Sequence, residues 1–518
     1  MRVNIPADKW PLIIAIALAL VFLTQGLFGN LKQSITWDET SYISAGYVYL
    51  KHSDFRLNPS HPPLMQELAA LPLLFLNLKS PSYNESWFYY KNPVLAYGKA
   101  FLFDSGNDII KIAFWARLPA LLLGTCLIMC IFLWGRSLFG AVPALASTAV
   151  AAFCPNLIAH SKVATEDMGC AALMFAALWT FWLGWQKKGR KYWIACGLIT
   201  GFALLAKYTA LLLVPIYVII TISLVFLKTK PKDAFLALLI VGSVSFFVVG
   251  AGYNFTFNWQ KYISGIASIY GDIAPGYSFY LLGKVSESPW WYYNLVGLVT
   301  KLPVASMALL FVAVASCLHY RGSRSHFVFI LTPVAVIILV SFFDKMNIGL
   351  RRILPVIPFL YLFTSLSLIS MKSRVKNFFV VFLLAVTAFE AISVFPYHLS
   401  FFNLVAGGPK NGPNIFDDSN IDWGQDLPAL AELQKQNKEL MPIKLYYFGS
   451  AEPRAYGIIY DNIFKDDIIN PKPGFYAVSV HNLIYLRKIM SKTGGDLDWL
   501  TKYTVYSYAG YSIYIYKF

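Results

Sequence analysis

Ten apolar runs of membrane-spanning length recur along this chain, and they exclude most other architectures. A helix needs about 20 apolar residues to cross the hydrocarbon core of a bilayer. Only 14% of the 518 residues are charged and 57% are hydrophobic, whereas a soluble domain carries about 25% charged residues. The sequence therefore predicts an α-helical polytopic membrane protein. The runs lie at 11–28, 113–133, 141–158, 168–185, 193–227, 234–253, 302–318, 327–343, 353–370 and 378–396.

The run at 193–227 is too long for one crossing, and basic clusters at 187–191 and 228–232 flank it. Basic residues favour the cytoplasmic side of a membrane, so this run is predicted to be a hairpin that turns outside near Lys207. The prediction is then about eleven transmembrane helices, with the N-terminus cytoplasmic and the C-terminus outside. The net charge of +16 follows from the same inner segments, so we expect no nucleic-acid partner.

The remaining segments predict two kinds of outer structure. Aromatic-rich loops at 29–112 and 254–301 join the runs, and the short apolar stretch 64–78 suits a juxtamembrane helix in the interface. From residue 397 the composition is that of a soluble protein, with predicted strands at 444–448, 474–480 and within 503–516, and a helix at 428–439. We therefore expect a transmembrane domain over 1–396 and a small extracytoplasmic α/β domain over 397–518.

Acidic and basic side chains are predicted to meet on the outer face. Cations there run against the positive-inside bias and therefore need a reason. Such a set suits chemistry on a lipid-linked phosphate, because cations can hold the phosphate and a carboxylate can take a proton from an incoming hydroxyl. The residues are Asp38, Glu39, His61, Glu166, Asp167, Lys207, Arg351 and Arg352.

Each of these residues also has a structural interpretation when it is taken alone. The acidic pairs at 38–39 and 166–167 could cap the helices that follow them. His61 could be an ordinary turn histidine, and Lys207 and the two arginines could extend from helix ends to the interface. The joint pattern indicates a site, whereas no single member does.

Several motifs resemble the GT-C class of membrane glycosyltransferases. The most similar group is the phospholipid-carrier-dependent glycosyltransferases related to protein O-mannosyltransferases and to the aminoarabinose transferases of lipid A. The motifs that carry the resemblance are Trp-Asp-Glu at 37–39, Asn-Pro-Ser-His-Pro-Pro-Leu at 58–64, and the segments 164–168, 206–209, 290–293, 349–355, 397–403 and 418–426.

The resemblance implies a GT-C fold and an inverting transfer of one sugar from a polyprenyl-phosphate carrier to an acceptor hydroxyl. The acceptor would be a protein, a lipid or a glycan, and the setting a bacterial inner membrane with its lipids. Asp38 would be the general base, Glu39 would position the acceptor or tune that base, and Asp167 would help to place the acceptor or the sugar. These three are the predicted catalytic residues.

The resemblance also implies a binding site for the carrier phosphate. His61, Lys207 and Arg351 match its cationic positions, with Arg352 assisting and Glu166 nearby. The alternatives from other functional classes are a transporter or flippase for a lipid-linked sugar, and a non-catalytic binder. A transporter is expected to carry internal repeats and charges at mid-membrane, and we find no repeat.

The sequence departs from its relatives at one position that bears on metals. Relatives often have a glutamate where this chain has Ser60, sometimes near a bound metal, so no certain cofactor is predicted and a divalent metal is doubtful. Glu67 is a speculative substitute. The six cysteines lie in apolar runs without zinc-type spacing. The segment 418–426 lacks the glycine position and the acidic twelfth residue of a calcium loop, so we predict a turn that docks the outer domain.

Overall fold

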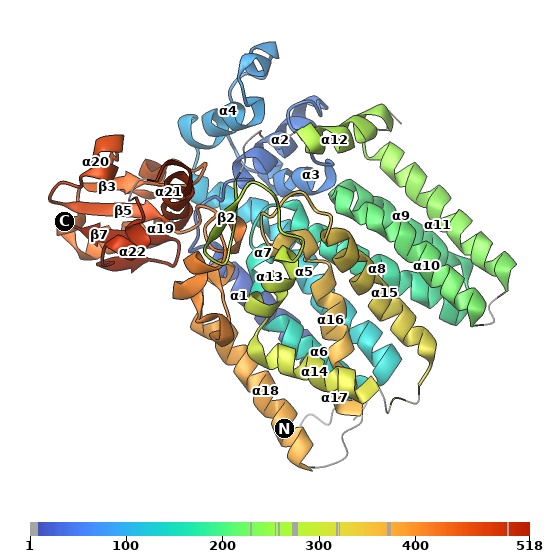
Figure 1. The fold of residues 1–518 in the computed structure, drawn as a ribbon. Coiled ribbons are helices and arrows are strands. Elements are labelled where there is room, and N and C mark those ends of the chain that lie inside the picture. Colours follow the sequence, from blue (N-terminus) through green and yellow to red (C-terminus); the bar gives the residue numbers. More distant parts are fainter. Residues whose placement is uncertain are drawn as a thin grey trace, which may run out of the picture.

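The computed structural model of the chain describes residues 9–227, 230–253, 255–256, 259–271, 278–317, 320, 322–369, 374–494 and 497–518. It is a bundle of helices with a small sheet domain at one end (Figure 1). Lys228, part of a basic cluster that orients the predicted hairpin, lies outside the described residues.

Six helical segments among the described residues are long and apolar enough to cross a membrane. Two further helix pairs pass the same test together but are bent, which raises the number to eight if each pair is one span. The protein is therefore a multi-pass membrane protein. The six are α1 (Trp10–Asn30), α5 (Ile109–Phe139), α8 (Glu166–Lys187), α10 (Leu213–Phe226) with its preceding turn η4 (Tyr208–Leu212), α11 (Pro231–Ala251) and α15 (Arg324–Ser341). The bent pairs are α6 (Ala141–Ala152) with α7 (Pro155–Ser161), at 60°, and α13 (Tyr293–Lys301) with α14 (Val304–Cys317), at 108°.

This number is lower than the predicted eleven. The other three predicted spans coincide with helices that are too short or too polar at one end: α9 (Arg190–Ala206), α16 (Val356–Thr364) followed by α17 (Leu366–Ile369), and α18 (Arg374–Ser393). Each of these three helices lies where a span was predicted, and the lower number counts only described helices that pass a test of length and composition. The predicted hairpin is confirmed, because α9 ends at Ala206 and Lys207 occupies the turn before η4.

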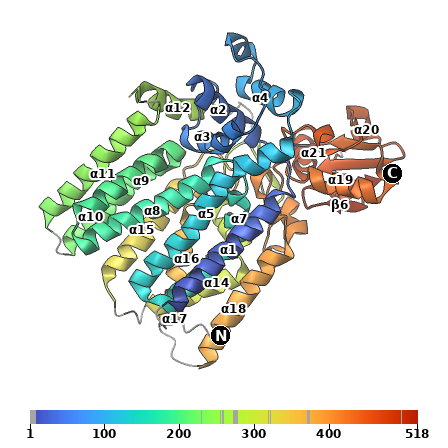
Figure 2. The same cartoon turned by 180° about the vertical axis from the view of Figure 1, so that it is seen from behind.

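The first-loop helices lie together at one end of the bundle, as Figures 1 and 2 show from opposite sides. They are α2 (Glu39–His52), α3 (Leu64–Ala70) and α4 (Pro93–Lys99), and α12 (Trp259–Gly271) of the second loop joins them. Gly46 is the point where α2 packs on α3, because a Cβ at this position would lie 1.9 Å from the carbonyl oxygen of Gln66. The start of the described chain lies at the opposite end of the bundle.

The sheet domain has five strands in the order β4-β3-β5-β7-β6. Strand β3 pairs in parallel with β4 and β5, whereas β7 is antiparallel to β5 and β6. All three predicted strand segments and the predicted helix are present, as β3 (Ile443–Tyr446), β5 (Phe475–Ser479), β6 (Ser507–Ala509) with β7 (Ile513–Lys517), and α19 (Leu427–Gln436). The prediction missed β4 (Tyr460–Asn462), and α20 (Lys465–Ile469), α21 (Val480–Thr493) and α22 (Trp499–Lys502) complete the domain. A separate hairpin joins β1 (Phe279–Leu281) to β2 (Lys284–Ser286).

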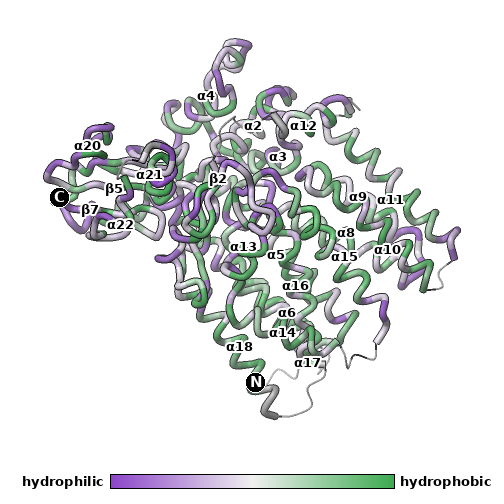
Figure 3. The backbone as a smooth tube through the Cα atoms, viewed as in Figure 1, coloured by the Kyte–Doolittle hydropathy of each residue, from purple (hydrophilic) through white to green (hydrophobic). Residues whose placement is uncertain are grey.

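The segment 418–426, which we call the docking turn, joins the sheet domain to the first loop. The backbone N–H of Ser34 donates to the carbonyl oxygen of Gln425 at 2.9 Å, and the Ser34 hydroxyl donates to Gly424 at 2.7 Å. The predicted docking role is therefore confirmed. The hydropathy of the residues also differs between the two ends of the molecule. The helices of the bundle are hydrophobic, and the segments at the end that carries α2, α4 and the sheet are more polar (Figure 3).

Candidate active site

Four separate segments bring acids and cations together at the end of the bundle that carries α2 and α3. Asp38 directly precedes α2, Glu166 and Asp167 begin α8, Lys207 follows α9, and Arg351 lies in the short turn η5 (Leu350–Ile353). Salt bridges connect all five residues. We call these five residues the acid–cation cluster.

Lys207 holds the buried side of the cluster. Its ammonium pairs with Asp167 and lies 3.2 Å from Oε1 of Glu166. Although burial by itself lowers the pKa of Lys207, the two carboxylates raise it above the usual value. Lys207 is therefore charged at neutral pH. Its pairing with both acids also shows that it does not simply extend to the membrane interface.

Arg351 joins the two acidic parts of the cluster. Its Nη1 lies 2.7 Å from Oδ2 of Asp38 and 4.0 Å from Oδ2 of Asp167. Its guanidinium also stacks on the ring of Trp423, 4.4 Å from the ring centre. Among the residues that the structure describes, none accepts a hydrogen bond from the buried Nε of Arg351, and such a donor calls for an explanation such as a water or a ligand.

Two of the three carboxylates predicted to be catalytic, Asp38 and Asp167, differ sharply in exposure. The Asp38 side chain is 25% exposed, whereas that of Asp167 is 0% exposed. Asp38 makes no side-chain cap of α2, so the capping interpretation does not explain its presence. Asp38 can therefore meet a substrate, whereas the carboxylate of Asp167 is buried and pairs with Lys207.

His61 lies at the edge of the cluster. Its Nδ1 is 3.4 Å from Oε1 of Glu166, its side chain is 34% exposed, and its ring packs against Tyr42. Burial and the nearby charges of Lys207 and Arg351 lower the pKa of His61. The imidazole is thus neutral at neutral pH in this structure, and it can offer a hydrogen bond to a phosphate.

A cavity of about 130 Å³ opens on the other side of His61. Aromatic and proline side chains form most of its wall, and two cations lie at its rim. The lining residues are Tyr49, Phe55, Arg56, Pro59, His61, Pro63, Tyr253, Lys261 and Ser264. The cavity therefore offers a largely apolar space beside the acid–cation cluster.

Glu39 does not face this site, although it is adjacent to Asp38 in sequence. Its two oxygens each lie 2.7 Å from a nitrogen of Arg117, and they also accept hydrogen bonds from the backbone N–H groups of Thr36 and Ala164 at 2.8 Å. Both members of this ion pair are fully buried. The geometry does not support the predicted catalytic role of Glu39, because its carboxylate is already occupied inside the protein.

The sequence reasoning missed Arg117. A signal was present, because an arginine inside an apolar run is costly unless it is paired or faces a polar interior. The identity of its partner could not be read from the sequence, since Glu39 lies 78 positions away.

Arg352 forms an ion pair with a residue outside the cluster. Its Nε and Nη2 lie 2.6 Å and 2.7 Å from the two oxygens of Asp344. This bidentate pair uses one edge of the guanidinium and leaves Nη1 out of it, so the assistance of Arg352 stays a prediction. The structure brings together Asp38, His61, Glu166, Asp167, Lys207 and Arg351, and it gives Glu39 and Arg352 ion-pair partners outside the cluster.

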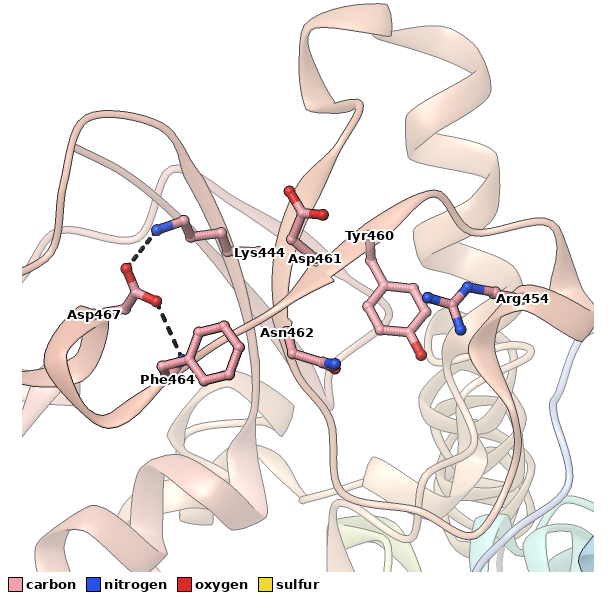
Figure 4. A pocket seen from close by; sticks show the side chains of 7 residues that line it. All are labelled: Lys444, Arg454, Tyr460, Asp461, Asn462, Phe464 and Asp467. Atoms are coloured by element: carbon pink, nitrogen blue, oxygen red, sulfur yellow. Dashed lines mark hydrogen bonds and ion pairs between the residues drawn. The ribbon is translucent and has the colours of Figure 1, made fainter.

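A larger pocket, of about 440 Å³, lies on the sheet domain and contains no member of the cluster (Figure 4). Lys444 and Asp467 in its wall already pair with each other, as the close view shows. Its size alone therefore does not make it the candidate active site. Within the described part of the chain, no group of three or more His, Cys, Asp or Glu side chains could hold a metal ion.

Comparisons with known proteins show which fold and which class of membrane protein this chain resembles. A family model described as dolichyl-phosphate-mannose-protein mannosyltransferase matches residues 94–250. The comparison with curated proteins found no match.

Solved structures match over nearly the whole chain at low identity. The apo structure of ArnT from Cupriavidus metallidurans is 12% identical, with a TM-score of 0.52, and the match covers 99% of this chain and 98% of that one. The structure of the same protein bound to undecaprenyl phosphate has a TM-score of 0.50, with the same identity and coverage. The apo oligosaccharyltransferase from Archaeoglobus fulgidus is also 12% identical, with a TM-score of 0.53, and the match covers 96% of this chain and 73% of that one. At this identity the likeness concerns the fold, and together with the family model it confirms the predicted resemblance to the GT-C class of membrane glycosyltransferases.

Proposed function

We propose that this protein is an inverting glycosyltransferase that moves one sugar from a polyprenyl-phosphate carrier to an acceptor hydroxyl. The observation that carries the proposal is the acid–cation cluster, in which the exposed carboxylate of Asp38 lies 2.7 Å from a cation, Arg351. A base for the acceptor and a charge for the leaving phosphate are thus adjacent, at the same end of the bundle.

Lys207 and Arg351 bind the carrier phosphate in this proposal. Both are charged, and the guanidinium can bind two phosphate oxygens at once. Holding the phosphate charge makes polyprenyl phosphate a good leaving group, so most of the catalysis comes from positioning and electrostatic stabilisation. Neutral His61 adds a hydrogen bond at the edge of this site.

Asp38 is the general base. The acceptor oxygen attacks the anomeric carbon from the face opposite the phosphate, and its proton passes to the Asp38 carboxylate. The bond between that carbon and the phosphate oxygen breaks, and polyprenyl phosphate leaves with the electron pair. A single displacement of this kind inverts the configuration at the anomeric carbon.

Asp167 and Glu166 act through the cations in this scheme. Their carboxylates are buried and lie within reach of the Lys207 ammonium, so they hold Lys207 in position and keep it charged. Glu39 and Arg352 are structural, because each is engaged in its own ion pair away from the cluster.

Two further observations support a lipid-phosphate donor. The cavity beside His61 has a mostly apolar wall, which suits the first part of a prenyl chain. Among proteins of the same fold, ArnT has been solved with undecaprenyl phosphate, and the Archaeoglobus fulgidus oligosaccharyltransferase AglB with an inhibitory peptide and a dolichol-phosphate. The acceptor in this proposal is a protein, lipid or glycan hydroxyl.

The proposed location is the bacterial inner membrane, with the N-terminus cytoplasmic and the sheet domain, over residues 397–518, outside the cell. The first-loop helices, the acid–cation cluster and the sheet domain all lie at one end of the bundle. A carrier lipid in the outer leaflet and an acceptor outside the cell would then reach the site from the same side.

The test is sugar transfer from a panel of radiolabelled polyprenyl-phosphate sugars to a membrane extract. Wild type and Asp38→Asn are compared, with Arg352→Ala as a control outside the cluster. We expect wild type and Arg352→Ala to move label and Asp38→Asn to move none while it still binds the donor. Donor binding without transfer by any of the three would refute the proposal and indicate a transporter or a carrier-binding protein.

A further inference from the structure

The docking turn, residues 418–426, contacts both sides of the Asp38–Arg351 ion pair, although it follows the last transmembrane segment. The two members of that pair come from segments 313 positions apart in the sequence. A structural element must therefore fix the distance between the backbones of Asp38 and Arg351. The contacts of the docking turn show that the turn is this element.

On the Arg351 side, the turn holds the backbone of the preceding residues. The Asn420 side-chain oxygen accepts a hydrogen bond from the backbone N–H of Leu350 at 3.0 Å, and the Ser419 hydroxyl donates to the carbonyl oxygen of Ile348 at 2.6 Å. Gly349 has φ +127°, and a Cβ there would lie 2.3 Å from Oγ of Ser419. The chain before Arg351 is thus packed directly on the turn.

On the Asp38 side, the turn holds the backbone of the residue before the proposed base. The backbone N–H of Trp37 donates to the carbonyl oxygen of Trp423 at 2.9 Å. Ser34 adds its two hydrogen bonds to Gly424 and Gln425. The entry to α2 is therefore anchored to the same turn as Arg351.

Trp423 is the residue that contacts both sides. Its carbonyl oxygen binds the backbone beside Asp38, and its ring lies under the guanidinium of Arg351 at 4.4 Å. The ring is 1% exposed and packs in a cluster with Ala159, Val163 and Leu399. A buried ring in fixed surroundings gives the guanidinium a fixed plane, and the cation–π attraction is stronger where water is excluded.

We propose that Trp423 is a positioning residue that orients Arg351 for the donor phosphate, so that the docking turn is a structural part of the active site. The proposal rests on the function proposed above, because it assigns Arg351 to the phosphate. The aromatic face keeps the guanidinium edge directed at Asp38 and at the space where the phosphate would lie. Without the ring, Arg351 keeps its charge but loses its orientation.

The experiment measures the binding of undecaprenyl phosphate, without a sugar, to the purified full-length protein. Trp423→Leu, Trp423→Phe, Arg351→Ala and the double variant Trp423→Leu/Arg351→Ala are compared with wild type. Trp499→Leu is the matched control, because Trp499 is a similarly buried tryptophan of the C-terminal domain that packs edge-on against other rings. Affinities are compared per folded protein, and thermal unfolding is recorded for every variant.

We expect Trp423→Leu to weaken binding about 3- to 30-fold, the range that a buried cation–π contact supports. Trp423→Phe should recover most of the affinity, and Trp499→Leu should leave it unchanged. In the Arg351→Ala background, Trp423→Leu should have no further effect on affinity. An equal loss in both backgrounds, or no loss from Trp423→Leu, would overturn the proposal.

The same proteins separate this inference from the proposed function. If wild type does not bind undecaprenyl phosphate, the proposed function fails, and the unfolding data still test the contact. Trp423→Leu should then destabilise wild type more than it destabilises Arg351→Ala, because the two side chains act as one unit. Additive losses of stability would show that Trp423 does not hold Arg351.

Discussion

Asp38 and Glu39 are adjacent carboxylates for which the structure predicts opposite mutational effects. Asp38 is partly exposed and paired with Arg351, whereas Glu39 is fully buried and paired with Arg117. Asp38→Asn should abolish transfer with little loss of stability, and Glu39→Gln should destabilise the protein. Both substitutions remove one negative charge and keep nearly the same shape, so the comparison is matched.

The magnitudes follow from the burial of each pair. Removing one partner of a buried ion pair costs about 3–5 kcal/mol, because the other charge stays buried without compensation. Glu39→Gln leaves Arg117 in that condition, and it also weakens the acceptor for the N–H groups of Thr36 and Ala164. Asp38→Asn should cost less, because Asp38 is 25% exposed and Arg351 keeps a second carboxylate, Asp167, at 4.0 Å. Loss of a general base lowers the rate by about 10²- to 10⁴-fold.

Two measurements on each variant test this reasoning. The free energy of unfolding is measured in mixed micelles, and transfer is measured from the polyprenyl-phosphate sugar that wild type uses, per folded protein. A double variant, Glu39→Gln/Arg117→Met, should lose less stability than the sum of the single losses, because no unpaired charge remains. If Glu39→Gln were as stable as wild type, or Asp38→Asn transferred sugar at the normal rate, the division of roles would be wrong.

The remaining predictions concern the cations, the sheet domain and the first-loop helices. Lys207→Ala should weaken the binding of undecaprenyl phosphate about 10- to 100-fold, as expected for a lost charged hydrogen bond. Arg352→Ala should leave this binding unchanged. Equal effects of the two substitutions in a lipid-binding titration would contradict the proposed phosphate site. His481 pairs with Asp417 at 2.8 Å, and although burial by itself lowers the pKa of His481, the Asp417 charge raises it. The contribution of this pair to stability is therefore complete below pH about 6.5 and is lost as the pH rises through the raised pKa of His481. His481→Gln should then flatten the decline of the unfolding free energy above that pH. A decline that the substitution leaves unchanged would exclude this pair as its source. Gly46→Ala should lower the free energy of unfolding by about 1–3 kcal/mol through overpacking, because its Cβ would meet the Gln66 carbonyl oxygen. If the variant unfolded at the same denaturation midpoint as wild type, α2 and α3 could separate at no cost.

The architecture could be predicted from the sequence because the lipid bilayer imposes it. Every predicted span coincides with a helix, and Lys207 lies at the predicted turn of the hairpin. Among the described residues, α9 with 17 residues and α16 with 9 are shorter than the 18 residues that a full-length span was required to have. Apolar composition shows that a segment avoids water, whereas the point at which its helix breaks depends on packing against neighbouring helices.

Most of the candidate site could be predicted for a similar reason. Cations at outer turns oppose a strong compositional bias, so Lys207 and Arg351 were conspicuous. The same reasoning could not separate Arg351 from Arg352, because neighbouring residues in a turn point in different directions. Asp344, eight positions before Arg352, pairs with that arginine through Nε and Nη2.

The sequence by itself determined that this protein crosses the membrane several times, that its loops carry paired acids and cations, and that its C-terminal part contains a small domain with a sheet. These properties depend on composition and on short-range periodicity, which each segment carries without its neighbours. Only the tertiary structure decided which acid is buried and which is exposed, that Arg117 neutralises Glu39, and that Trp423 lies beneath Arg351. Those outcomes depend on contacts between residues tens to hundreds of positions apart, and a side chain's burial and charge partners are set by such contacts.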